Sequence, residues 1–169
     1  MLVYDGTGRH PALQGAEKSA GMGADTTFVS IDGDIAAELT YAERAIWKQR
    51  LYKRNINMKF DHRLRRIERV GNQLTAEFSN EATGSKFLQI ADEIVVEHGT
   101  VSADDLYHAL RKFSTNDGVT DLDALLTSKP QPHSYGSKSG FVLHRIGDAV
   151  TSRNIAAAIY DALRLCHIM

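Results

Sequence analysis

The chain has little cysteine, no long apolar run and almost no net charge, and each shortage excludes a class of protein. Cys166 is the single cysteine, so the chain cannot build an internal disulfide or a cysteine-bound iron–sulfur cluster, and a reducing, cytoplasmic setting is expected. No run of eighteen apolar residues and no secretory signal pattern occurs, so we expect no membrane partner. A formal net charge of −1 gives no basis for nucleic-acid binding.

What is present begins with an alternation of strand and helix patterns up to Phe60. Thr40 and Glu43 have the spacing of a capping box that opens the second helix. A strand–helix alternation of this kind predicts a parallel sheet with crossover helices. The predicted elements are the strands Leu2–Tyr4, Thr26–Ile31 and Ile56–Phe60, a helix from about Pro11 to Gly23, and a helix from Thr40 to about Asn55 with apolar positions at Ala42, Ala45, Ile46 and Leu51.

Beyond Phe60 the pattern changes to an alternation of apolar and polar residues, which predicts a half-exposed antiparallel meander. Its strands are Arg63–Val70, Leu74–Ser79 and Phe87–Ala91, with Leu64, Ile67, Leu74, Ala76 and Phe78 as the inward positions. Ile94–Val96 is predicted to return as a buried strand. Residues 102–127 are expected to be helical in two pieces.

The sharpest motif lies near the C-terminus. An apolar run, Phe141–Ile146, ends in Gly147 and Asp148, and a helix rich in small residues follows over Asn154–Cys166. The glycine lets the backbone approach a ligand closely, and the aspartate can accept hydrogen bonds from ligand hydroxyls. Free N–H groups at the helix start suit a pyrophosphate. The pattern predicts that a strand delivers both groups to one bound dinucleotide.

This stretch resembles the second flavin-binding motif of the glutathione-reductase-like flavoproteins. The resemblance becomes more specific at residues 145–150 (Arg-Ile-Gly-Asp-Ala-Val) and 152–155 (Ser-Arg-Asn-Ile). They are similar to the C-terminal part of the large NADH:flavin oxidoreductases related to trimethylamine dehydrogenase, histamine dehydrogenase and 2,4-dienoyl-CoA reductase. Residues 3–11 and 95–100 fit the same group, so the resemblance covers nearly the whole chain.

The resemblance implies an α/β fold. Residues 1–128 would form a glutathione-reductase-like NAD(P)H-binding domain, a Rossmann-like parallel sheet with crossover helices plus a three-stranded antiparallel meander. Residues 129–140 would be a linker, and residues 141–169 the C-terminal strand and helix of an incomplete FAD/ADP-binding domain. The family's FMN-holding barrel and iron–sulfur cysteines have no counterpart here, so FMN and the cluster would lie on missing regions and the chain alone would show little turnover.

A phosphate-binding loop is predicted at Gly6-Thr7-Gly8, directly after the first strand. Pro11 stands where the third glycine of the usual pattern falls, so Gly15 is taken as that glycine and the loop as about four residues longer than standard. Asp32, after the second strand, can bind ribose hydroxyls, which favours NADH over NADPH. The alternatives are a plain glycine turn and a turn role for Asp32. In the resembled family, amine dehydrogenases keep this domain's shape without using it.

The resemblance places Gly147 and Asp148 against the ribityl or pyrophosphate part of FAD, or against an ADP bound in the same place. Arg153, Asn154 and Ile155 would contact the same ligand from the helix start. Two alternatives stay open: Asp148 as a helix N-cap and Arg153 as a surface ion-pair residue.

His98 and Gly99 follow a strand at the carboxyl edge of the sheet, where ligands bind in open α/β folds. We expect His98 to make a structural contact at the seam between two nucleotide domains. The alternative is that His98 contacts a ligand.

Two functions are consistent with these patterns. The first is the nucleotide-binding C-terminal portion of an FMN/FAD-dependent NADH:flavin oxidoreductase or amine dehydrogenase, which positions a dinucleotide for electron transfer. The alternative is a stand-alone Rossmann-like nucleotide-binding or assembly module without catalysis. The helix Asn154–Cys166 carries an apolar face that the missing barrel and flavin domain would cover in a full protein. In this chain we expect the face to pack onto the first domain in a non-standard way, to pair with a second copy, or to be swapped between copies.

Overall fold

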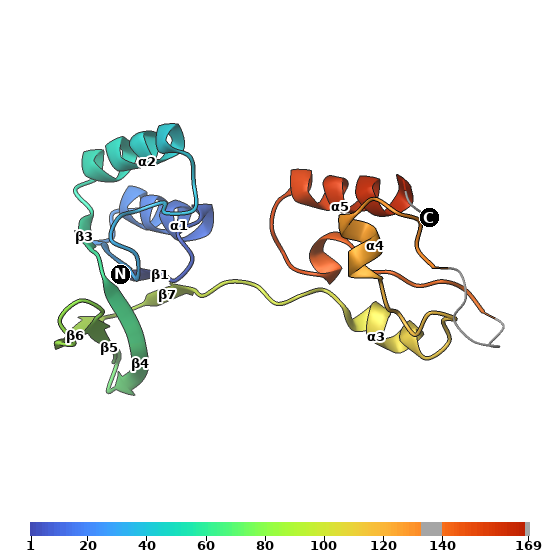
Figure 1. Cartoon of the computed structure of the whole chain (residues 1–169). Coiled ribbons are helices and arrows are strands. Elements are labelled where there is room, and N and C mark those ends of the chain that lie inside the picture. The colour runs from blue at the N-terminus through green and yellow to red at the C-terminus, as the bar shows by residue number, and fades with distance from the viewer. Residues whose placement is uncertain (133–139, 168–169) are drawn as a thin grey trace. The chain divides into compact units, whose positions relative to one another are not determined.

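A computed structural model of the protein describes residues 1–132 and 140–167 (Figure 1). The chain divides into two compact units, Met1–Gly99 and Thr100–Met169. Residues 100–128, which the sequence groups with the N-terminal domain, pack with the C-terminal unit. The kind of cofactor domain that each unit represents remains a prediction.

The first unit is built on a parallel sheet with the strand order β3-β2-β1-β7. Val3 of β1 lies opposite Phe28 of β2 on one side and Val95 of β7 on the other. This confirms the predicted parallel sheet with crossover helices. The elements are β1 (Leu2–Asp5), α1 (His10–Gly21), β2 (Thr27–Ser30), α2 (Tyr41–Lys53), β3 (Asn57–Lys59) and β7 (Ile94–Glu97).

The two helices cover one face of this sheet. Val3 and Phe28 are fully buried there against Leu13 of α1 and Leu51 of α2, and Trp47 is 5% exposed in the same cluster. The capping box forms as predicted, because Thr40 accepts a hydrogen bond from the Glu43 N–H and the Glu43 carboxylate accepts one from the Thr40 N–H.

The antiparallel meander covers the other face. Its strands are β4 (His62–Val70), β5 (Gln73–Asn80) and β6 (Lys86–Ala91), in that order. Leu2 and Tyr4 of β1 pack against Phe78 of β5, and the rings of Phe78 and Phe87 stack with centroids 4.9 Å apart. The first unit therefore has three layers: helices, parallel sheet and meander.

Two burial predictions for this unit are wrong. Val95 and Val96 are 41% and 40% exposed, because β7 is the last strand on its side of the sheet. Ile67 is 37% exposed, since the second half of β4 is exposed throughout. On α2 the side chain of Ile46 is 55% exposed, whereas those of Trp47 and Leu51 are buried.

The second unit holds short helices around a long one. Its described elements are α3 (Asp105–Arg111), α4 (Leu122–Leu126), the 3-10 turn η1 (Gly147–Ala149) and α5 (Ile155–His167). The predicted strand Phe141–Ile146 is not formed; an isolated bridge joins Ser114 and Phe141. The Asn116 amide bonds both the N–H and the C=O of Leu143, at 2.9 and 2.7 Å. A side chain therefore satisfies the backbone groups that a neighbouring strand would use.

Among the described residues, no helix has both the length and the apolar character needed to cross a membrane.

Candidate nucleotide site

The glycine turn of the first unit follows β1 directly, as predicted, and α1 begins at His10. The turn is therefore not about four residues longer than the standard loop. Gly15 lies in the second turn of α1, where an added Cβ would be 3.9 Å from Val95. Pro11 occupies the first turn of the helix, where its missing N–H leaves no bond unmade.

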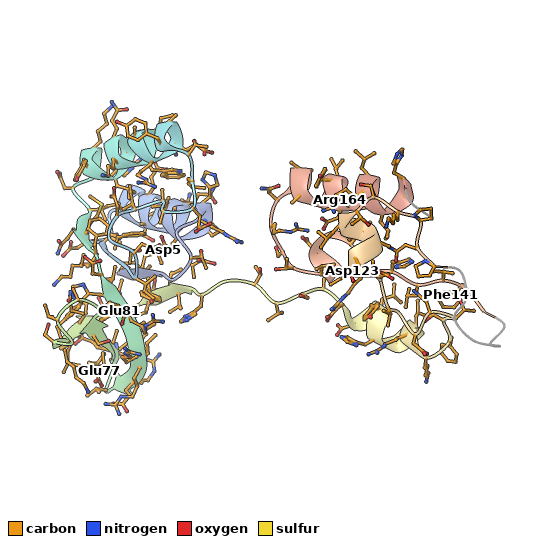
Figure 2. All side chains as sticks on the ribbon, viewed as in Figure 1. Asp5, Glu77, Glu81, Asp123, Phe141 and Arg164 are labelled. Atoms are coloured by element: carbon orange, nitrogen blue, oxygen red, sulfur yellow. The ribbon has the colours of Figure 1, made fainter. Side chains whose placement is uncertain are left out.

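Every N–H group of Gly6-Thr7-Gly8 already has an acceptor in the protein. The Gly6 N–H donates to the carbonyl of Glu97 at 2.8 Å. The N–H groups of Thr7 and Gly8 both donate to Oδ1 of Asp5, at 3.1 and 2.9 Å. Asp5 is fully buried and lies among the packed side chains of the first unit (Figure 2). A carboxylate of the chain thus occupies the donors that a phosphate would use.

Two more carboxylates surround this turn. Glu97 accepts hydrogen bonds from the Thr7 hydroxyl and, at 3.0 Å, from the Gly99 N–H. An added Cβ on Gly8 would lie 2.9 Å from Oδ2 of Asp32. Burial raises the pKa of Asp5, and the charges of Glu97 and Asp32 raise it further. The pKa of Asp32 is also raised, by burial first and then by the charges of Glu38 and Asp61. The electrostatic surroundings of the turn are therefore unfavourable for an anion.

His98 and Gly99 lie at the end of β7, beside the same turn. The His98 ring is tilted against the ring of Tyr4, with centroids 5.8 Å apart. Gly99 has a φ of +93°, which favours glycine. The expected domain-seam role of His98 stays a prediction.

In the second unit, Gly147 lies in η1 and is held against α5. Its φ is +55°, and an added Cβ would be 3.1 Å from the Cβ of Ala158. Its N–H donates to Oδ2 of Asp161 on α5 at 3.1 Å. The glycine is therefore needed for close approach, but the backbone that it approaches is that of α5.

Asp148 is exposed, and its carboxylate makes no hydrogen bond or ion pair with any described residue. It does not cap α5; the side chain of Asn154 does so, by accepting a hydrogen bond from the Ala157 N–H at 2.8 Å. The N-cap alternative for Asp148 is therefore wrong, and its carboxylate is available to a ligand. The carbonyl of Asp148 accepts the Ala103 N–H at 2.9 Å, which fixes the turn to the start of the unit.

Arg153 forms an ion pair with Asp161, the aspartate that also holds Gly147. The ion-pair alternative is thus realised, and the same side chain lines a cavity of about 490 Å³ in this unit. Ile155 begins α5 and is 81% exposed. The cavity wall combines three arginines with apolar and hydroxyl groups, among them Arg145, Arg153, Arg164, Tyr107, Ile146 and Thr151.

Three residues that position these turns were missed in the sequence. Asp5 carried a usable signal, because an aspartate often accepts a hydrogen bond from the backbone N–H two residues on, and Thr7 stands at that position. Glu97 and Asp161 act across 90 and 14 positions of the chain. No local pattern reports such distant pairings.

Known proteins are similar to this chain over almost all of its length, although no family model matches it. It is 38% identical over 168 residues to the multifunctional alkene reductase/demethylase OYE of Caballeronia cordobensis, a match covering 98% of this chain and 25% of that protein. It is 37% identical over 165 residues to the probable N-methylproline demethylase of Rhizobium meliloti, covering 98% and 24%.

Among solved structures, histamine dehydrogenase from Rhizobium sp. 4-9 aligns with a TM-score of 0.70 over 98% of this chain and 22% of that one. At 18% identity this likeness shows the fold. The chain spans about a quarter of the length of the curated relatives that it matches. The resemblance is thereby confirmed, and the chain corresponds to a C-terminal part of the NADH:flavin oxidoreductase family.

Proposed function

We propose that this chain is the nucleotide-binding portion of an FMN/FAD-dependent oxidoreductase or amine dehydrogenase, and that it positions FAD or ADP through its second unit. The free carboxylate of Asp148 carries the proposal. It is exposed on a turn that is fixed on both sides, by the Ala103 N–H and by the contact of Gly147 with α5.

Asp148 does not itself line the cavity, but its neighbours Ile146 and Val150 do, and we assign its carboxylate and the cavity arginines to one dinucleotide. Asp148 would accept hydrogen bonds from ribose or ribityl hydroxyls. Arg145, Arg153 and Arg164 bring positive charge to the cavity wall, and Arg164 lies on α5 (Figure 2). Arginine is well suited to a phosphate, since its planar donors match the phosphate oxygens. A bound FAD would supply the capacity to carry electrons, whereas a bound ADP would only anchor the fold.

The printed names of the two relatives point to the reaction class. One is an alkene reductase/demethylase and the other a probable N-methylproline demethylase. We infer that the whole protein acts on an N-methylated amine or an activated alkene. FMN and any iron–sulfur cluster would be held by parts of that protein outside these residues. The alternative of a stand-alone module without catalysis is not favoured, because the relatives are oxidoreductases.

Titration of the full chain with ADP and with FAD, followed by thermal melting, tests the proposal. We expect either nucleotide to raise the melting temperature, and we expect Asp148→Ala to remove most of that rise. Asp105→Ala is the matched control, because Asp105 is an exposed aspartate on α3 of the same unit. Equal shifts in wild type and Asp148→Ala, or none in wild type, would refute the assignment.

A further inference from the structure

We propose that Asp5 is a specificity-determining residue that closes the glycine turn of the first unit to NADH, by filling it with a carboxylate of the chain. The inference rests on the proposed function and deepens it. It selects an amine-dehydrogenase type of protein over one that receives electrons from NADH through this unit.

The hydrogen bonds give the first argument. A pyrophosphate binds a glycine turn through free backbone N–H groups. Here the Thr7 and Gly8 N–H groups both donate to Asp5 Oδ1, at 3.1 and 2.9 Å, and the Gly6 N–H donates to the Glu97 carbonyl at 2.8 Å. A dinucleotide would have to break all three bonds, two of them to a carboxylate.

The space beside Gly8 is also occupied by the protein. The value of glycine in such a turn is that the ligand approaches where a Cβ would be. At Gly8 that volume is already taken: an added Cβ would lie 2.9 Å from Asp32 Oδ2 and 3.0 Å from the Ala37 side chain. The Glu38 N–H donates to the Gly8 carbonyl at 3.1 Å, so the segment after β2 is fastened over the turn. Gly8 therefore makes room for the protein.

Charge gives the third argument. Asp5, Asp32 and Glu97 all lie at this turn, and Asp5 is buried with an Oδ2 atom that has no described hydrogen-bond partner. The basic residues beside the turn are Arg9, His10 and His98. His10 accepts a hydrogen bond from the Trp47 indole at Nδ1, and the His98 ring lies against Tyr4. A pyrophosphate would add negative charge beside three carboxylates in a partly buried place, where such repulsion is poorly screened.

The proposal assigns different nucleotide-binding properties to the two units. A nicotinamide dinucleotide has no open phosphate site in the first unit, while FAD or ADP has a free carboxylate in the second. Asp32 keeps a position suited to ribose hydroxyls, but the pyrophosphate on which such binding depends is excluded.

The decisive experiment is amide NMR on the ¹⁵N-labelled full chain. In wild type we expect the Thr7 and Gly8 amides to exchange with solvent at least about tenfold more slowly than in Asp5→Ala. We also expect NADH, added up to about 10 mM, to cause no saturable shift of these signals. In Asp5→Ala, NADH should shift them. Asp25→Ala, which removes an exposed carboxylate elsewhere in the unit, should behave as wild type.

Three outcomes would overturn the proposal: saturable NADH shifts at Thr7 and Gly8 in wild type, unprotected exchange of these amides in wild type, or a folded Asp5→Ala that stays silent to NADH. If Asp5→Ala does not fold, the two wild-type measurements still decide. Signals of residues 147–158 report ADP binding to the second unit in the same spectra. Failure of the proposed function would therefore appear there and leave the Thr7 and Gly8 result intact.

Discussion

The two units differ in how completely their apolar side chains are buried. In the first unit the sheet is covered on both faces, and Leu2, Val3 and Phe28 are fully buried. Among the described residues of the second unit, the buried hydrophobic side chains are Ala124 and Leu165. Along α5 the side chains of Ile155, Ile159, Tyr160 and Leu163 are between 57% and 81% exposed. Within the described residues α5 therefore carries an exposed apolar face, and its predicted covering stays a prediction. We infer that the first unit is self-sufficient and that α5 needs a surface from elsewhere, either the rest of the protein or a second copy.

The same contrast holds at the two turns. The turn after β1 is complete within the protein, because Asp5 fills it. At the η1 turn the Asp148 carboxylate has no hydrogen-bond or ion-pair partner among the described residues, although the backbone of the turn is well fixed. In the well-packed unit the N–H donors of the turn are already occupied, and in the less well-packed unit the carboxylate of Asp148 is available. The competence to bind a nucleotide is therefore expected in the less well-packed unit.

The largest expected effect comes from the core of the first unit. Phe78→Ala removes a fully buried ring that packs against Tyr4 and Phe87, and should lower the free energy of unfolding by about 3–5 kcal/mol. Urea unfolding followed by Trp47 fluorescence measures it, since Trp47 is the single tryptophan and lies in this unit.

Leu163→Ala is the matched truncation in the second unit, on the exposed face of α5 (64% exposed). It should change the free energy of unfolding by no more than about 0.5 kcal/mol. A large loss for Leu163→Ala would mean that a second copy covers α5 in solution. A small loss for Phe78→Ala would mean that the meander does not stabilise the sheet.

Features of the fold that depend on interactions between near neighbours in sequence could be predicted, whereas features that depend on distant residues could not. The strands and helices of the first unit, its parallel order and the Thr40 cap depend on local periodicity and nearest neighbours, and all were predictable. The exposure of Val95 was not, because it depends on β7 having no strand beyond it. The missing strand at Phe141–Ile146 likewise depends on Asn116, which takes the backbone groups of Leu143 from a distance of 27 positions.

The candidate site divides in the same way. The glycines mark where the chain turns after β1 and at η1, but their spacing gave the first loop the wrong length and does not tell which acceptor a turn holds. At the first turn the acceptor is Asp5, and recognising it needs the burial of that side chain as well as its position. The predicted contacts of the candidate site residues with a ligand stay predictions. These residues are Gly6, Thr7, Gly8, Asp32, His98, Gly99, Gly147, Asp148, Arg153, Asn154 and Ile155.

An intermediate effect is expected from the two helix caps. Thr40→Ala and Asn154→Ala each remove a side-chain acceptor from a helix start, which costs about 1 kcal/mol. In the first unit the loss should appear in urea unfolding. In the second unit it should appear as faster amide exchange in the first turn of α5, with little change in the Trp47 transition. Thr40→Ser and Asn154→Asp keep the acceptor and should restore both readouts. A shift of the Trp47 transition by Asn154→Ala would show that the units unfold together.

The smallest effect concerns the pH dependence of the buried Asp5. Burial raises the pKa of Asp5 above its ordinary 3.8 in the folded protein, so the folded state holds its proton more tightly than the unfolded state does. Stability is therefore lost as pH rises from that ordinary value through the raised pKa, and the loss is complete above it. Asp5→Asn cannot ionise, yet its carbonyl can still accept the Thr7 and Gly8 N–H groups. The unfolding free energy of wild type should consequently fall relative to that of Asp5→Asn as the pH is increased through this window, in urea titrations at a series of pH values. A wild type that gains stability over Asp5→Asn with rising pH would mean that the two N–H groups outweigh burial. The turn would then favour negative charge and could accept an anion. That result would contradict the proposed difference between the two units, in which the first unit is closed to a phosphate.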